Sequence, residues 1–338
     1  MAKALVTGGA GFLGSHLADY LIEEMGAEVV VLDDLSGGFA DNVHPEARLV
    51  EGSIVDHDLV DRLFASERFD FVYHLAAYAA EGLSHFIKRF NHTNNLIGSV
   101  NLINAAVNTG VRCFVFTSSI AVYGAGQLPM REDMLPRPED SYGIAKLAVE
   151  QELEASRAMF GLDYVIFRPH NVYGPRQNLG DRYRNVVGIF MNRLMRGEEL
   201  IIFGDGDQQR AFTYVDDVIP AMARSAELDR ARNRIFNAGA DAVYSVNELA
   251  ERVMQAMGLH GELRHVEARN EVYRAWSDHS RFRSVFPGAA STSIEDGLAR
   301  MAAWANEAGV RSSAPFEAIE IRKNLPAAWL ESPLGDPG

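Results

Sequence analysis

The chain opens on a short apolar run, Ala4-Leu5-Val6, followed at once by Thr7-Gly8-Gly9-Ala10-Gly11-Phe12-Leu13-Gly14. Glycines at positions 8, 11 and 14 permit a sharp turn and let backbone N–H groups approach a diphosphate at the start of a helix. The run before the loop reads as a strand, and 12–24 reads as an amphipathic helix after it. The segment therefore predicts the first strand–turn–helix unit of a dinucleotide-binding sheet.

The second expected strand, Glu28 to Leu32, ends in Asp33, nineteen positions beyond Gly14. An acidic residue at this place in a dinucleotide-binding unit accepts hydrogen bonds from the adenosine ribose hydroxyls. The alternative is that Asp33 and Asp34 form a solvated turn. No arginine follows to receive a 2′-phosphate, and two acids would repel one, so the sequence favours NAD over NADP.

Short β-branched runs alternate with longer amphipathic stretches through the first half of the chain, which is typical of a parallel sheet covered by helices. Further strands are expected at 71–75, 113–116 and 164–167, and long helices at 96–108 and 142–159. We predict an α/β fold: a Rossmann-type doubly wound parallel sheet with a smaller α/β substrate-binding lobe.

The predicted domain division places the NAD-binding domain at 1–170 and the substrate lobe mainly at 171–338. Two segments within 201–240 are expected to return strands to the first domain, namely 201–203 and 235–237. The tail from Ser332 holds two prolines and two glycines and is expected to fray.

The composition narrows the class of protein. Of 338 residues, 47% are apolar and 23% charged, and 32 Lys and Arg against 46 Asp and Glu give a net charge of −14. This balance argues against binding to nucleic acids or anionic membranes. The single cysteine, Cys113, cannot form an internal disulfide, which fits a reducing compartment, and no apolar run is long enough to span a membrane. We expect a soluble cytoplasmic enzyme, with no metal site because the histidines lack ligand spacing.

Two further segments carry groups suited to proton transfer. Tyr142 and Lys146 lie four residues apart, which places both on one face of a helix. A nearby ammonium group and the positive nicotinamide ring would together lower the pKa of a tyrosine, so Tyr142 could act as a base near neutral pH. The hydroxyls of Thr117, Ser118 and Ser119 follow a strand, where they would point into the ligand crevice. The alternatives are an exposed helix pair and turn capping.

Together these parts resemble the extended short-chain dehydrogenase/reductase family and, within it, the NAD-dependent sugar-nucleotide 4-epimerases. The resemblance runs from Lys3 to about Arg281. It rests on TGGAGFLG, LDDLSGG, HLAA, TSSIAVYG, YGIAK, RPHNVYGPRQ and GDGDQQRAFTYVDDV taken jointly.

The resemblance implies residue roles. Tyr142 is the base, Lys146 its partner and Ser119 the third catalytic member, since the family's hydroxyl stands three residues before Val122. Thr117 and Ser118 are expected to touch the sugar, as are Ser119 and Tyr142. The cofactor contacts implied are Gly8, Gly11, Phe12, Leu13, Gly14, Asp33, Ile54, Leu75, Ala76, Asn95 and Lys146. The diphosphate and nucleoside contacts implied are Asn171, Arg210, Arg269 and Glu271.

The two residues after Ser119 narrow the choice of reaction. Sugar-nucleotide 4,6-dehydratases of this family carry Asp-Glu after the strand-end hydroxyl, whereas this chain has Ile120-Ala121, which cannot transfer protons. Epimerisation at C4 needs only one base and a hydride carrier. Tyr142 would remove the O4 proton while tightly bound NAD takes the C4 hydride. The transient 4-keto sugar would then turn, and the hydride would return to its opposite face.

The substrate is expected to be a UDP-hexose of the UDP-glucose/UDP-galactose type. One alternative is UDP-glucuronate, with Arg182 or Arg184 on the C6 carboxylate. Others are a net NAD-dependent sugar-nucleotide oxidoreductase and a non-catalytic nucleotide sensor. By the resemblance, the two long helices would pair across a homodimer interface. The apolar residues Leu147, Leu153 and Met159 are consistent with that interface and equally with packing inside one chain.

Overall fold

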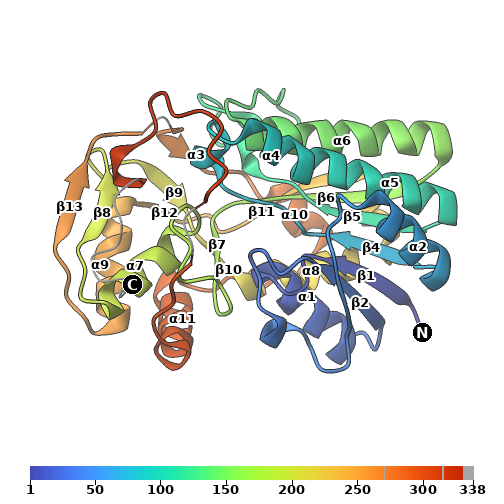
Figure 1. Ribbon diagram of the computed structural model, residues 1–338, viewed down its shortest axis with the longest axis horizontal. Helices are drawn as coiled ribbons and strands as arrows, with labels where there is room; N and C mark the ends of the chain where they lie inside the picture. The colour runs from blue at the N-terminus through green and yellow to red at the C-terminus, as the bar shows by residue number, and fades with distance from the viewer. Residues whose placement is uncertain (270, 314–315, 330–338) are drawn as a thin grey trace.

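A seven-stranded parallel sheet with the order β11-β6-β5-β4-β1-β2-β3 forms the centre of the protein (Figure 1). Every neighbouring pair is parallel; Leu5, for example, lies opposite Val30 on one side and Val72 on the other. The strands are β1 (Lys3–Thr7), β2 (Glu28–Asp33), β3 (Arg48–Glu51), β4 (Phe71–His74), β5 (Cys113–Thr117), β6 (Asp163–Pro169) and β11 (Arg234–Ala238). The Rossmann-type fold predicted from the sequence is confirmed.

The structure is a computed structural model that describes residues 1–269, 271–313 and 316–329. The tail from Ser332, which was expected to fray, lies outside these residues. Within the described ranges, no helix is both long and apolar enough to cross a membrane.

Helices cover both faces of the sheet because each strand sends alternate side chains to opposite hydrophobic layers. Leu5 and Val30 face one layer of helices, and Val6 and Val31 face the other. The first layer holds α2 (His57–Glu67), α5 (Gly98–Thr109) and α6 (Ser141–Phe160); the second holds α1 (Phe12–Glu23), α8 (Ile219–Ser225) and α10 (Ser280–Val285). Figure 1 shows α5 and α6 above the strands and α1 and α8 below them.

The remaining elements gather beyond the carboxyl ends of the central strands, on the left in Figure 1. Three small sheets lie there: β8 (Leu200–Phe203) with β13 (Leu263–Val266); β9 (Gln209–Ala211) between β12 (Val243–Ser245) and β14 (Arg274–Ala275); and β7 (Val172–Tyr173) with β10 (Thr213–Tyr214). The helices are α7 (Val186–Met195), α9 (Val246–Met257) and α11 (Ile294–Ala308), with the short α3 (Glu81–Ser84) and α4 (Lys88–His92) after β4.

The two late segments that were expected to rejoin the central sheet behave differently. Residues 235–237 lie in β11, which pairs with β6 at the edge of the sheet. Residues 201–203 lie in β8, which pairs with β13 instead, so that expectation is wrong. The physical reason is that β13 supplies the backbone hydrogen-bond partners of β8 in a separate small sheet. The division into domains near residue 170 stays a prediction.

Strand order positions the site. The chain passes from β1 to β2 on one side, whereas β4 lies on the other side of β1. In open parallel sheets this reversal leaves a crevice at the carboxyl ends of the two diverging strands, where ligands bind. The glycine-rich loop leaves β1 and the segment from Leu75 leaves β4 at this crevice.

Candidate active site

The loop after β1 is built so that backbone alone faces the crevice. Gly8 has φ +72°, and a Cβ there would come within 2.8 Å of the Ala76 backbone nitrogen. A Cβ on Gly14 would lie 2.1 Å from the Gly8 carbonyl oxygen, so neither position accepts a side chain. Helix α1 follows with Gly11 as its N-cap and no capping side chain. Its first N–H groups therefore point, with the positive end of the helix, at the place where a diphosphate would bind.

Asp33 closes the same cavity from the end of β2. Its Oδ2 accepts the Ala10 N–H at 3.0 Å and its Oδ1 accepts the Leu35 N–H at 2.9 Å, which holds the carboxylate against the glycine-rich loop. Burial raises the pKa of Asp33, while these backbone donors oppose that rise. A carboxylate fixed at this point suits a ribose diol, which donates two hydrogen bonds.

A cavity of about 280 Å³ lies between the glycine-rich loop, Asp33 and the ends of β4 and β5. Ten of the eleven predicted cofactor residues line it: Gly8, Gly11, Phe12, Leu13, Gly14, Asp33, Ile54, Leu75, Ala76 and Lys146. The exception is Asn95, whose buried amide accepts the Tyr78 N–H at 2.8 Å and donates to the Tyr78 carbonyl at 3.1 Å. Asn94 lines the cavity instead. The structure thus places Asn95 behind the wall, where it fixes the loop after β4, and its direct cofactor contact stays a prediction.

Tyr142 and Lys146 lie on the first turns of α6, which begins at Ser141 because Asp140 accepts the Gly143 N–H at 2.8 Å. The Lys146 ammonium donates to the Thr117 carbonyl at 2.7 Å and lies 4.7 Å from the centre of the Phe116 ring. It is 5.6 Å from the centre of the Tyr142 ring. The face shared by Tyr142 and Lys146, expected from their spacing, is therefore turned into the sheet end and not to solvent.

Burial and neighbouring groups set the pKa values of Tyr142 and Lys146. Burial and the negative charge of Glu81 raise the pKa of Tyr142, and a hydrogen bond with Ser119 lowers it. Burial also lowers the pKa of Lys146 to about 7. The sequence predicted a lowered tyrosine pKa from the Lys146 ammonium together with the positive nicotinamide ring. Lys146 by itself does not lower the pKa of Tyr142, so that prediction now depends on the positive ring beside the phenol.

The three strand-end hydroxyls point in different directions. Thr117 Oγ1 contacts the Met222 sulfur at 3.7 Å, and Ser118 Oγ donates to Glu150 at 2.5 Å, so both are occupied inside the protein. Ser119 Oγ accepts the Ala121 N–H at 3.1 Å and faces the Tyr142 hydroxyl. Ser119 is therefore best placed to act on the reacting group, and sugar contacts of the other two hydroxyls stay predictions.

A buried ion pair that the sequence analysis did not find supports these residues. Arg168 on β6 pairs with Glu150 on α6, and each side chain is only 2% exposed. Arg168 also donates to the Tyr123 hydroxyl at 2.7 Å. The signal available in the sequence was the position of Glu150, one helical turn beyond Lys146 on the face that carries the predicted base.

A second and larger cavity, of about 770 Å³, adjoins the first. The two share Ser119 and Tyr142 in their walls. Four other predicted substrate residues, Asn171, Arg210, Arg269 and Glu271, line the larger cavity. A substrate in this cavity would thus meet a cofactor in the smaller one at the predicted base.

The far part of the larger cavity is positively charged. Arg210 donates to the Tyr273 carbonyl at 3.0 Å, and Arg269 lies over the Phe203 ring at 4.7 Å. Glu271 links both, at 3.5 Å from Arg210 and 3.1 Å from Arg269. Among the residues that the structure describes, the buried Nε of Arg269 has no hydrogen-bond partner. Guanidinium groups with unused donors suit a diphosphate. The ribose contact predicted for Glu271 stays a prediction, since its carboxylate holds the arginines.

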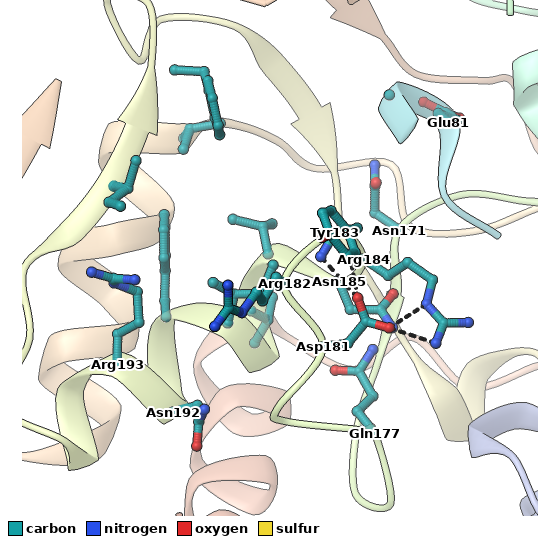
Figure 2. Close-up of a pocket in the computed structure, with 18 of the residues that line it drawn as sticks. Glu81, Asn171, Gln177, Asp181, Arg182, Tyr183, Arg184, Asn185, Asn192 and Arg193 are labelled. Carbon is teal, nitrogen blue, oxygen red and sulfur yellow. Dashed lines mark hydrogen bonds and ion pairs between the residues drawn. The ribbon is translucent and has the colours of Figure 1, made fainter. Parts of the chain in front are cut away.

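Arg182 and Arg184, the candidates for a sugar carboxylate, have different surroundings. Arg184 pairs with Asp181, with Arg184 Nε 2.6 Å from Oδ2, and lies 4.8 Å from the centre of the Tyr78 ring (Figure 2). Arg182 lines the larger cavity. In Figure 2, Arg182 points toward the side that Arg193 occupies, and Glu81 lies on the opposite side.

Histidines do not build a metal centre in the part of the chain that the structure describes, where no cluster of three or more His, Cys, Asp or Glu side chains could hold an ion. His74 is fully buried and forms hydrogen bonds of 2.7 Å with Thr7 Oγ1 and with Ser99 Oγ. It is a hydrogen-bonded core residue.

The fold is a Rossmann-type sheet in which a glycine-rich loop leads into a helix with no capping side chain. A tyrosine, a lysine and a serine lie between two adjoining cavities. This combination is typical of an enzyme that uses a nicotinamide dinucleotide. Residues 4–239 match the model of the NAD dependent epimerase/dehydratase family, and the chain belongs to that family. It is an NAD-dependent sugar-nucleotide epimerase, as the sequence indicated.

Three relatives match this chain over nearly their whole length. The UDP-glucose 4-epimerase of Mycolicibacterium smegmatis is 37% identical over 306 residues, covering 88% of this chain and 96% of the relative. The solved UDP-glucose 4-epimerase of Thermotoga maritima with UDP-glucose is 35% identical, with a TM-score of 0.86 over 90% of this chain and 99% of that one. The UDP-glucuronic acid 4-epimerase of Bacillus cereus, with UDP-glucuronic acid and NAD, is 27% identical, with a TM-score of 0.83 over 91% and 100%.

Proposed function

We propose that the protein epimerises a UDP-hexose at C4, interconverting UDP-glucose and UDP-galactose type sugars without net oxidation. The observation that carries the proposal is the wall shared by the two cavities. Ser119 and Tyr142 face both, so one base serves a sugar on one side and a nicotinamide on the other. The solved relative that contains UDP-glucose, at 35% identity, supports the choice of sugar.

In this proposal Tyr142 holds the proton at O4 of the sugar. Ser119 orients the phenol through their hydrogen bond. Lys146, fixed by the Thr117 carbonyl, supplies a donor at the floor of the cofactor cavity. When bound, NAD supplies the hydride acceptor and donor for C4 and a positive ring that lowers the pKa of Tyr142.

The nucleotide end is held by groups that do not react. Arg210 and Arg269 bind the diphosphate, and Asn171 is positioned for it by donating its amide to the Ala211 carbonyl at 3.0 Å. Anchoring the diphosphate while the sugar remains free allows the 4-keto sugar to present either face to the same base. The glycine-rich loop, Asp33 and Lys146 would hold NAD throughout the reaction, so no second substrate would be consumed.

The glucuronate alternative is weakened by Arg184, whose guanidinium is already neutralised by Asp181 at 2.5 Å. That alternative then depends on Arg182. A net oxidoreductase would use the same residues but would release NADH.

The test is an incubation of purified protein with UDP-glucose and, separately, UDP-glucuronate, with no cofactor added, followed by proton NMR of C4. The proposal expects UDP-galactose from the first and no epimer from the second. Conversion of the uronate alone would overturn the choice of sugar. Free NADH accumulating with substrate would favour the oxidoreductase.

We also propose a cytoplasmic homodimer. On α6, Ile144 and Met159 are 46% and 75% exposed, and Ile97 before α5 is 50% exposed. Leu153, expected on this surface, is buried in the core and contributes nothing to it. Light scattering after gel filtration gives the test: a mass of about twice 37.3 kDa is expected, and a mass of 37.3 kDa would contradict the dimer.

A further inference from the structure

Glu81 stands out among the acidic side chains of the larger cavity. It is the first residue of the short helix α3, and its side chain is exposed to the cavity. Among the described residues, no hydrogen bond or ion pair involves its carboxylate. Each of the other acidic residues lining the cavity has a partner: Glu139, Asp140, Asp181, Glu198, Glu199 and Glu271.

The backbone around Glu81 is tied to the predicted base. Ser84 Oγ donates to the Glu81 carbonyl at 2.6 Å and accepts the Tyr142 N–H at 3.1 Å. The next residue, Gly82, lies against the Trp329 ring, which a Cβ on Gly82 would approach to 3.3 Å. Glu81 therefore has a fixed place relative to Tyr142, although its carboxylate is free.

Glu81 lies between the two ends of the cavity: it lines the same walls as Tyr142 and Arg210, and a Cβ on the adjacent Gly82 would lie 3.9 Å from Arg269 Nη1. The negative charge of Glu81 raises the pKa of Tyr142 and therefore opposes formation of the phenolate. The arginines of the diphosphate end, Arg210 and Arg269, act on Glu81 in turn. A substrate with its diphosphate at the arginines and its C4 at Tyr142 has its hexose ring between them, which is the position that Glu81 lines.

We propose that Glu81 is the specificity residue for the sugar: its carboxylate accepts hydrogen bonds from hexose hydroxyls and excludes sugars that carry a carboxylate. The inference rests on the proposed C4 epimerisation and deepens it. A carboxylate can accept hydrogen bonds from two neighbouring hydroxyls at once, whereas it repels a second carboxylate brought to the same place. The pocket then selects neutral hexoses in two ways, because the carboxylate binds their hydroxyls and repels the carboxylate of a uronate.

Burial and the charge of Asp140 raise the pKa of Glu81 above its usual range. Glu271 adds to this effect, and Arg210 and Arg269 oppose it. The discrimination is therefore measured at pH 8.5, where the carboxylate is ionised.

The experiment compares wild type with Glu81→Gln, which keeps the shape and removes the charge, and Glu81→Asp, which keeps the charge and shortens the side chain. Glu152→Gln removes the same charge from an exposed position of α6 and is the matched control. The readouts are kcat/KM for UDP-glucose and the calorimetric Kd for UDP-galactose and UDP-glucuronate on the NAD-loaded protein. Thermal melting verifies that each variant is folded.

Glu81→Gln should weaken UDP-galactose binding about 10-fold or more, because a charged acceptor is lost, and should tighten UDP-glucuronate binding by about 10-fold or more. Glu81→Asp should keep the uronate excluded while weakening the neutral sugars, and Glu152→Gln should change neither. Opposite shifts for the two sugars cannot come from a merely structural defect.

Three results would overturn the inference: equal weakening of both sugars in Glu81→Gln, an unchanged ratio of their Kd values, or wild-type protein that binds the uronate as tightly as UDP-galactose. In each of these, wild-type conversion of UDP-glucose would leave the proposed epimerisation standing. Loss of that conversion with sugar selectivity retained in the Kd values would instead refute the reaction and keep the role of Glu81 in binding.

Discussion

Replacing Tyr142 with phenylalanine removes one oxygen from the wall that the two cavities share. The ring is 7% exposed and packs beside Lys146 and Ser119, so Phe preserves the packing and the fold. The hydroxyl has Ser119 as its hydrogen-bond partner, and its loss removes the proton acceptor. General-base catalysis contributes about 10²- to 10⁴-fold, equivalent to about 3 to 5 kcal/mol of transition-state stabilisation. We expect Tyr142→Phe to lower kcat by this factor while the Kd for UDP-galactose changes less than about 3-fold.

A double-mutant cycle with Ser119→Ala sharpens this prediction. Because Ser119 acts through the phenol, Ser119→Ala alone should lower kcat by about 10- to 100-fold, the value of a hydrogen bond to a charged group. The double variant should then be no slower than Tyr142→Phe. The assay is epimerisation followed by NMR, with cofactor content measured in each variant. Unchanged turnover in Tyr142→Phe, or additive losses in the double variant, would refute the reasoning.

Three further predictions concern the scaffold. Gly14→Ala should release NAD and lower stability by about 1 to 3 kcal/mol, because its Cβ would lie 2.1 Å from the Gly8 oxygen. Gly188→Ala, whose Cβ would meet its nearest neighbour at an ordinary 3.5 Å, should keep NAD bound, and retained cofactor in Gly14→Ala would contradict the prediction. Glu150→Gln should cost about 3 to 5 kcal/mol in urea unfolding by leaving Arg168 buried without its anion, and a loss under 1 kcal/mol would contradict the pairing. Burial lowers the pKa of His170 to about 3. As the pH falls from about 6.5 toward 3, only the unfolded chain takes up a proton at His170, so stability is lost in that window. His170→Gln should reduce the slope of unfolding free energy against pH there by about one proton, and equal slopes in the two proteins would contradict the prediction.

The parts of the site that could be predicted are those set by local chemistry. A glycine loop between a strand and a helix has few other uses, and the carboxyl end of a parallel strand fixes where Thr117 to Ser119 must lie. Tyr142 and Lys146 share a helix face by spacing alone. For these residues, their spacing along the chain determines their position in space to within a helical turn.

The parts that could not be predicted depend on contacts between distant segments. Glu81 lies in a four-residue helix with no periodicity to place it, and its surroundings come from Arg210, Arg269 and Trp329, far along the chain. Glu150 looks like an ordinary exposed helix residue until Arg168 is brought against it. The amide of Asn95, whose cofactor contact stays a prediction, holds the Tyr78 backbone, and only the folded loop reveals this second role.

In the proposed reaction, the hydride removed from C4 stays in the site and returns to the opposite face. This is tested by converting UDP-glucose deuterated at C4, in ordinary water and with no cofactor added, and recording the NMR spectrum of the product. We expect UDP-galactose that retains the deuterium at C4, with no free NADH. Deuterium replaced by solvent hydrogen at C4, or NADH released in proportion to substrate consumed, would rule the reaction out.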